Sequence, residues 1–117
     1  MHSSSYTPTQ ATDEFFTDAT HELTTGNGYT AGGAALGTKT EVLTSLTTSL
    51  RAAATTWTPG SGETLTGRIL VIRKDTGTDS TSPLLGYVDL GADTSATNAD
   101  WTATWDATDG VLKISAS

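Results

Sequence analysis

The most apolar stretch of the chain is residues 65–91, where two apolar runs flank a polar turn that contains glycine and proline. This pattern predicts a β-hairpin. In its first strand, Leu65 and Ile69 lie on one face while Leu70 and Ile72 lie on the other, so both faces are apolar. A strand of that kind is covered by other parts of the protein on both sides. We therefore expect this hairpin to form the centre of the fold.

Shorter segments predict further strands on either side of the hairpin. Residues 39–48 and 49–58 are rich in threonine, a β-branched residue that favours strands. In residues 101–105, tryptophan and alanine alternate with threonine, and Asp109-Gly110 predicts a tight turn before a closing strand at residues 111–116. Such spacing without intervening helices predicts a mainly β fold, either an antiparallel β-sandwich or a partly closed barrel.

The N-terminal part of the chain has a different character. Residues 1–11 are mostly serine, threonine and other polar residues, so we expect a flexible N-terminal arm, with residues 12–117 forming a single β-rich domain. The arm could also lie along a neighbouring protein. After Thr12, early acids and the apolar residues Phe15, Phe16 and Leu23 follow near helical spacing, which predicts one short N-terminal helix.

Residues 24–40 are dense in glycine, which predicts a shaped loop rather than a regular element. Gly26 and Gly28 have a spacing found in some nucleotide-binding loops, but no strand precedes them, so a phosphate-binding role is disfavoured. Tyr29 is expected to act as a loop anchor or as a contact residue.

Composition and charge narrow the possible partners. The chain has a net charge of −7 and only six basic residues, which argues against binding to nucleic acid. It has no cysteine, so a disulfide framework is not expected, and no apolar run is long enough to cross a membrane. The segment before Lys39 contains no lysine or arginine, but it contains the acids Asp13, Glu14 and Asp18. These acids either form an ordinary solvated surface or dock onto a basic partner.

We find no catalytic, cofactor-binding or metal-binding residues in the sequence. Asp75 with Asp79, and Asp106 with Asp109, sit in predicted turns, where aspartate commonly binds backbone amides. No serine or threonine has the context of an activated nucleophile. The three tryptophans, Trp57, Trp101 and Trp105, suit either a core or a carbohydrate-stacking surface, so a carbohydrate-binding module stays an alternative.

Several segments together resemble a family of small virion structural proteins of tailed bacteriophages. The segments are GYTAGG at residues 28–33 with the following residues 36–40, VIRKDTGT at 71–78, TSPLLGYVDLG at 81–91 and WDATDG at 105–110. Their order and spacing carry the resemblance, which covers most of the chain after Thr12. Arg73 departs from the family pattern, in which an aromatic residue is frequent at that position.

The resemblance implies a non-enzymatic virion protein, assembled in the host cytoplasm, that acts as a capsid decoration or minor capsid protein. Its expected partner is the major capsid protein, and a tail or head-tail connector component is the alternative. We also expect self-association, with a trimer as the expected form, because a domain this small gains buried core by association. The residues that we expect to contact a partner come from the N-terminal third of the chain. They are Tyr6, Asp13, Glu14, Phe15, Phe16, Asp18 and Tyr29.

Overall fold

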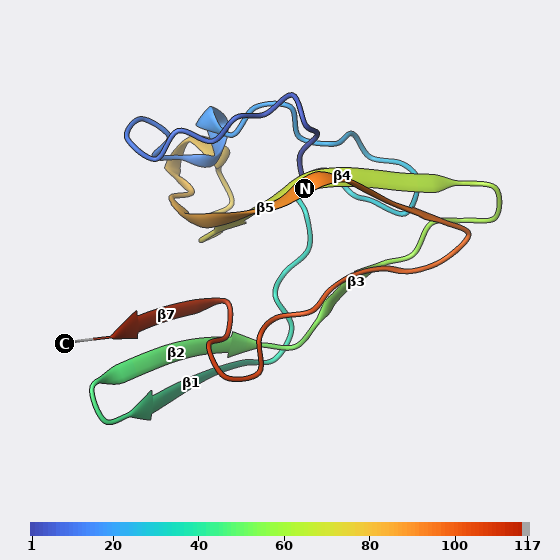
Figure 1. The fold of residues 1–117 in the computed structure, drawn as a ribbon. Helices are drawn as coiled ribbons and strands as arrows, with labels where there is room; N and C mark the ends of the chain where they lie inside the picture. Colours follow the sequence, from blue (N-terminus) through green and yellow to red (C-terminus); the bar gives the residue numbers. More distant parts are fainter. Residues whose placement is uncertain (116–117) are drawn as a thin grey trace.

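The computed structural model of the protein describes residues 1–115 and contains seven β-strands and two short 3-10 turns (Figure 1). The strands are β1 (Lys39–Thr44), β2 (Thr47–Ala52), β3 (Thr55–Trp57), β4 (Thr64–Arg73), β5 (Leu84–Thr97), β6 (Trp101–Ala103) and β7 (Leu112–Ser115). The turns are η1 (Phe16–Asp18) and η2 (Asp79–Thr81). Among residues 1–115, no helix has the length and apolar character needed to cross a bilayer.

The predicted central hairpin is present as β4 and β5, which pair antiparallel along most of their length. β5 is longer than expected, because it continues past Gly91 to Thr97. The polar composition of this part of the chain is typical of a loop. The pairing register shifts between Gly67 and Ile69. β4 contributes to both hydrophobic clusters, but the predicted faces are wrong: Leu65 packs with Leu70 and apart from Ile69, because the register shift lies between Leu65 and Ile69.

All pairing between strands is antiparallel, and it produces three separate sheets. The sheets are β1-β2-β7, β3-β6 and β4-β5. The prediction of a mainly β protein with antiparallel sheets is confirmed. No sheet closes into a barrel within residues 1–115, and a sandwich of two facing sheets stays a prediction. The expected closing strand includes Ala116, which lies outside the described residues.

The N-terminal segment is part of the core, so the expectation of a flexible arm at residues 1–11 is wrong. Met1, His2 and Tyr6 are only 6%, 0% and 5% exposed. The His2 amide donates a hydrogen bond to the Ile69 carbonyl, and the His2 carbonyl accepts one from the Ile69 amide. Residues 1–2 thus extend the β4-β5 sheet by a short bridge, a long-range pairing that composition alone does not reveal.

The predicted helix after Thr12 is also wrong, because only the 3-10 turn η1 forms there. The Asp18 carboxylate accepts hydrogen bonds from the amides of Glu14 and Phe15, at 3.0 and 2.9 Å. Phe15 has an extended backbone and bridges to Pro83. Short acidic side chains that bind nearby amides compete with helix formation, and here the competing arrangement is the one that forms.

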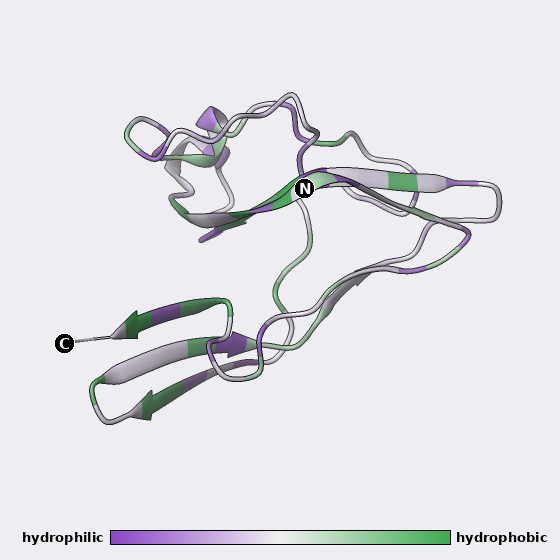
Figure 2. Ribbon diagram, viewed as in Figure 1, coloured by the Kyte–Doolittle hydropathy of each residue, from purple (hydrophilic) through white to green (hydrophobic). Residues whose placement is uncertain are grey.

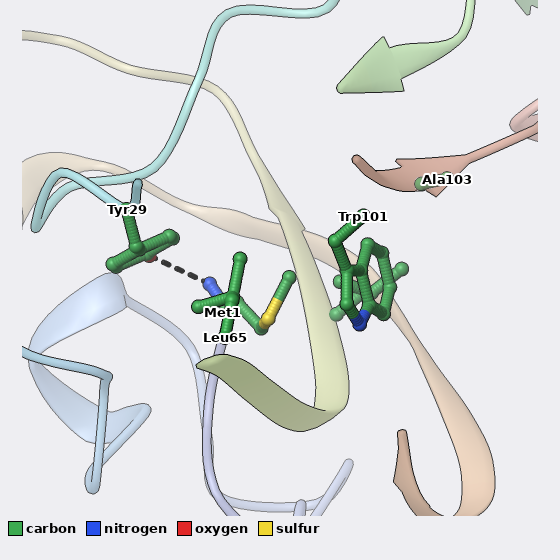
Figure 3. Packing of buried hydrophobic residues seen from close by; sticks show 6 residues of the cluster. Met1, Tyr29, Leu65, Trp101 and Ala103 are labelled. Atoms are coloured by element: carbon green, nitrogen blue, oxygen red, sulfur yellow. Dashed lines mark hydrogen bonds between the residues drawn. The ribbon is translucent and has the colours of Figure 1, made fainter. Parts of the chain in front are cut away.

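Two hydrophobic clusters stabilise the part of the molecule outside the β1-β2-β7 sheet. The larger one joins the N-terminus to distant parts of the chain, because Met1 packs with Tyr29, Leu65 and Trp101 (Figure 3). The second contains Tyr6, Phe16, Ala19 and Ile69. The radius of gyration is 14.9 Å, somewhat above the value of about 13 Å for a compact chain of this length. The extra length comes from the β1-β2-β7 sheet, which projects from the rest (Figure 1).

Candidate interaction surfaces

Three of the seven residues expected to contact a partner are buried in the folded chain. Tyr6, Phe16 and Tyr29 are 5%, 8% and 2% exposed. The Tyr6 hydroxyl donates a hydrogen bond of 2.8 Å to the Asp13 carboxylate, and burial together with this carboxylate raises the pKa of Tyr6. Burial removes these three aromatic side chains from any docking surface that leaves the fold intact.

Tyr29 anchors the glycine-dense loop, which is the first of the two roles predicted for it. Its hydroxyl donates a hydrogen bond of 2.7 Å to Glu22 and accepts one of 2.7 Å from the Met1 amine (Figure 3). Burial and the Glu22 carboxylate raise the pKa of Tyr29, while burial lowers the pKa of the Met1 amine to about 6. Glu22 also accepts a hydrogen bond from the Gly32 amide, so these groups fix the loop against the core.

Two of the predicted acids, Asp13 and Asp18, form hydrogen bonds with the local backbone. Asp13 accepts hydrogen bonds from the Thr9 amide and the Tyr6 hydroxyl, at 2.9 and 2.8 Å. The Thr9 amide is the main reason that the pKa of Asp13 is lowered. Asp18 accepts the two amide bonds described above. Both residues are acids of a chain with a net charge of −7, so they contribute to the electrostatic potential of this region.

Glu14 and Phe15 are exposed, and the fold brings them close to the start of β5. The Leu84 amide donates a hydrogen bond of 2.9 Å to the Glu14 carbonyl. Leu85 and Tyr87 on β5 are 49% and 40% exposed, and Phe15 is 36% exposed. Leu85 and Tyr87 also line a recess of about 170 Å³ together with Tyr6, Pro8 and Asp13.

We call this surface the N-terminal patch, made of Asp13, Glu14, Phe15, Leu85 and Tyr87. It combines negative charge with exposed apolar and aromatic area, a composition that many protein-binding surfaces share. On the neighbouring strand β4, Leu70 is only 7% exposed and belongs to the core.

The tryptophans pack against one another and against the core. Trp101 is 6% exposed, and its indole nitrogen donates a hydrogen bond of 3.1 Å to the Thr94 carbonyl. The rings of Trp57 and Trp101 meet edge to face at 5.7 Å, and Trp57 also lies 6.2 Å from Tyr29. Trp101 and Trp105 border a recess of about 500 Å³ that Val88, Leu90 and Val111 also line. The face of Trp101 is therefore not available as a flat platform for a sugar ring.

The acidic turns have the structural role that their sequence context indicated. The Asp75 carboxylate accepts a hydrogen bond from the Gly77 amide. The Asp106 carboxylate accepts hydrogen bonds from the amides of Thr108 and Asp109, which lower the pKa of Asp106. Asp79 forms an ion pair of 2.6 Å with Arg73. Within residues 1–115, no three potential metal-ligating side chains gather at one place.

Arg73 contacts three segments and was not singled out as a contact residue by the sequence. Its guanidinium lies 3.7 Å from the centre of the Phe16 ring, a cation–π arrangement, and it also donates to the Gly32 carbonyl at 3.3 Å. With His2, Phe16 and Trp57 it lines a recess of about 220 Å³. A guanidinium group can stack on an aromatic ring as another aromatic ring does, so Arg73 can pack against Phe16.

A second exposed surface lies on the β1-β2-β7 sheet, and the sequence reasoning missed it. Leu43, Leu112 and Ile114 project from this sheet and are 71%, 42% and 66% exposed. Figure 2 shows hydrophobic positions on all three strands. Leu43 shares its face of β1 with Lys39 and Glu41, so residues 39–44 carry no apolar alternation that would have indicated this surface.

No protein family, curated protein or solved structure matches this chain.

Proposed function

We propose that this chain is a structural protein of a tailed-bacteriophage virion, most simply a capsid decoration or minor capsid protein. In this role it binds the major capsid protein on the outside of the head and reinforces the shell where capsid subunits meet. The observation that carries the proposal is the ordered set of four segments, from residue 28 to residue 110, that resembles the phage family. A mainly β chain with exposed apolar surfaces supports it.

The N-terminal patch is the surface that we propose for contact with the shell. Its acids suit a basic surface on the capsid subunit, and Phe15, Leu85 and Tyr87 supply apolar area for the centre of an interface. Of the residues expected to contact a partner, the N-terminal patch retains Asp13, Glu14 and Phe15. The buried aromatic residues are left out, and Leu85 and Tyr87 of β5 are added. The proposed protein performs no catalysis.

Assembly on the particle would also bring copies of this chain together, with a trimer as the proposed form. Self-association buries apolar area that a chain of 117 residues leaves exposed. We further propose that the architecture becomes a β-sandwich in the assembled state, because the β1-β2-β7 sheet then gains a second layer.

Two alternatives remain distinct from this proposal. A tail or head-tail connector component would be equally non-catalytic and would use the same kind of surface, but in far fewer copies. A carbohydrate-binding module would need an exposed aromatic platform, and the burial of Trp101 weighs against it.

Copy number separates decoration from the alternatives. Quantitative mass spectrometry of purified particles of the phage that encodes this chain would compare its peptides with those of the major capsid protein. Decoration predicts hundreds of copies per particle, on the order of the number of symmetry-related shell sites. A dozen copies or fewer would move the protein to the tail or the connector, and its absence from the particle would refute a structural role in the virion.

A further inference from the structure

The sheet formed by β1, β2 and β7 is amphipathic, with its aliphatic side chains gathered on one face. Residues that pair directly across antiparallel strands share a face. Here Thr48 pairs with both Leu43 and Ile114, and Leu50 pairs with Leu112. We call the face defined by Leu43, Leu50, Leu112 and Ile114 the open face. The opposite face carries mostly threonine, serine, arginine and lysine side chains.

Most of the open face is exposed in the described residues 1–115, with Leu50 only partly buried. Leu43 and Ile114 are 71% and 66% exposed, and Leu46 at the tip of the hairpin is 66% exposed. The sheet stands away from the β4-β5 hairpin (Figure 1), and β1 and β7 each pair only with β2. Small sheets need their apolar face buried to be stable in water, so this face lacks the second layer that its side-chain pattern calls for.

We propose that the open face binds the open face of a second copy of this chain. A twofold interface brings the same patch together twice, so the patch must be complementary to itself. Two aliphatic sheet faces meet this condition, because their side chains interdigitate at a layer spacing of about 10 Å.

Charge favours a second copy over a basic partner at this face. Among the residues that the pairing places on the open side, only Lys39 and Glu41 are charged, and their charges cancel. The open face is therefore electrically neutral on a chain whose net charge is −7. A second copy is not repelled there, whereas a basic protein would be drawn to the acidic N-terminal patch instead.

The size of the face sets the strength of the contact. With strands about 4.8 Å apart and a rise of about 3.3 Å per residue, two strands of six residues and one of four present roughly 250 Å². Stable interfaces bury about 800 Å² per partner, so this pair is weak in free solution. We expect a dissociation constant on the order of 0.1 mM. Many copies held close together on one particle would populate it much more fully.

The first test follows the purified chain by sedimentation and by amide NMR spectra between about 20 µM and about 1 mM. The proposal predicts a reversible increase in mass with concentration, with shift changes concentrated in β1, β2 and β7. A chain that stays monomeric at about 1 mM would overturn it. No phage particle is involved, so this result does not depend on the function proposed above.

The second test uses the double variant Leu43→Thr with Ile114→Thr. Both side chains are exposed in the single chain, and threonine keeps strand propensity, so the fold and its melting temperature are retained. The dissociation constant should rise at least about tenfold, since the aliphatic contact area is lost. The matched control is Leu85→Thr, an exposed leucine of the N-terminal patch, which should leave association unchanged. Association that survives the double variant, or that only Leu85→Thr abolishes, would place the contact elsewhere and refute the proposal.

Discussion

Single glycines set the path of the loops, and Gly28 shows how. Gly28 has φ +79, and a Cβ built on it would overlap the backbone carbonyl of Thr58. Gly62 has nearly the same φ, +81, but open space around the Cβ position. The two positions share the cost of a left-handed backbone and differ in the packing that surrounds them.

The pair Gly28→Ala and Gly62→Ala separates these two costs. Gly62→Ala should lower the free energy of unfolding by about 1 kcal/mol through backbone strain alone. Gly28→Ala should cost at least about 2 kcal/mol more, because the Thr58 backbone cannot move aside as a flexible side chain could. Urea unfolding of both variants and the parent chain gives the comparison. Equal losses for the two variants would mean that the residue 24–40 loop is not packed against Thr58.

His2 makes the stability depend on pH. Its ring lies between Tyr6 and Phe16, at centroid distances of 5.1 and 5.8 Å, and its Nδ1 lies 2.8 Å from the Thr20 carbonyl oxygen. Burial lowers the pKa of His2 below its ordinary value of 6.5, an effect that Thr20 and Glu22 oppose and the Met1 amine and His21 assist. The folded chain thus binds this proton less readily than the unfolded chain.

The sign of the pH effect follows from that difference. The contribution of His2 is fully present above pH 6.5 and is lost as the pH falls below that value toward the folded-state pKa. The Met1 amine acts in the same sense, because its pKa falls from 8.0 to about 6 in the folded chain, and its contribution is lost between those two values. Unfolding free energies measured from about pH 8 to about pH 5 should therefore decrease. His2→Gln should flatten the decrease below pH 6.5, whereas His21→Gln, an exposed control, should not; identical slopes in all three proteins would contradict this assignment.

At the level of elements, the N-terminal segment is the one whose loss matters most. Met1 and Tyr6 each belong to a different hydrophobic cluster, and the backbone of residues 1–2 bonds to Ile69 and Leu23. Deleting residues 1–10 removes those contacts together. The expected result is a loss of at least about 3 kcal/mol of stability or the loss of a cooperative unfolding transition.

Point variants make the same test without shortening the chain. Tyr6→Ala should cost about 3 kcal/mol, because it removes a buried aromatic ring, whereas Ser5→Ala at an exposed neighbouring position should leave the melting temperature unchanged. Thermal unfolding followed by circular dichroism is the measurement. A truncated chain that melts like the full chain would show that residues 1–10 are the free arm that their composition suggests.

The central hairpin is largely predictable from the sequence because its signals are local. The strands predicted at residues 39–48 and 49–58 are wrong in their bounds, because the chain turns at residues 45–46 between β1 and β2 and is interrupted again before β3. Alternation around Ile69 and Leu70 and the turn at Asp109-Gly110 depend only on neighbouring residues. The burial of His2 is not predictable in this way, since it depends on a partner strand more than sixty residues away. Three of the expected contact residues were misassigned for the same reason: aromatic side chains in a polar segment suggest exposure until the segment is seen to be packed.

For the whole molecule, charge should control binding to the shell. The acids of the N-terminal patch face solvent on a chain of net charge −7, so added salt should weaken binding to capsid shells. Glu14→Gln should weaken binding about three- to tenfold at low salt and reduce its salt dependence. Asp93→Asn, which removes an exposed charge elsewhere on β5, should have little effect. Cosedimentation with shells that lack this protein measures all three chains, and equal binding by both variants would exclude the patch.

A three-dimensional reconstruction of the intact phage particle tests the central claim most directly. The account predicts density on the outer surface of the head, between capsid subunits, that fits the β4-β5 hairpin with the N-terminal patch against the shell. Heads assembled without this chain should lack that density and be otherwise unchanged in symmetry. Density for this chain found only in the tail or at the connector, or in no part of the particle, would contradict a role in capsid decoration.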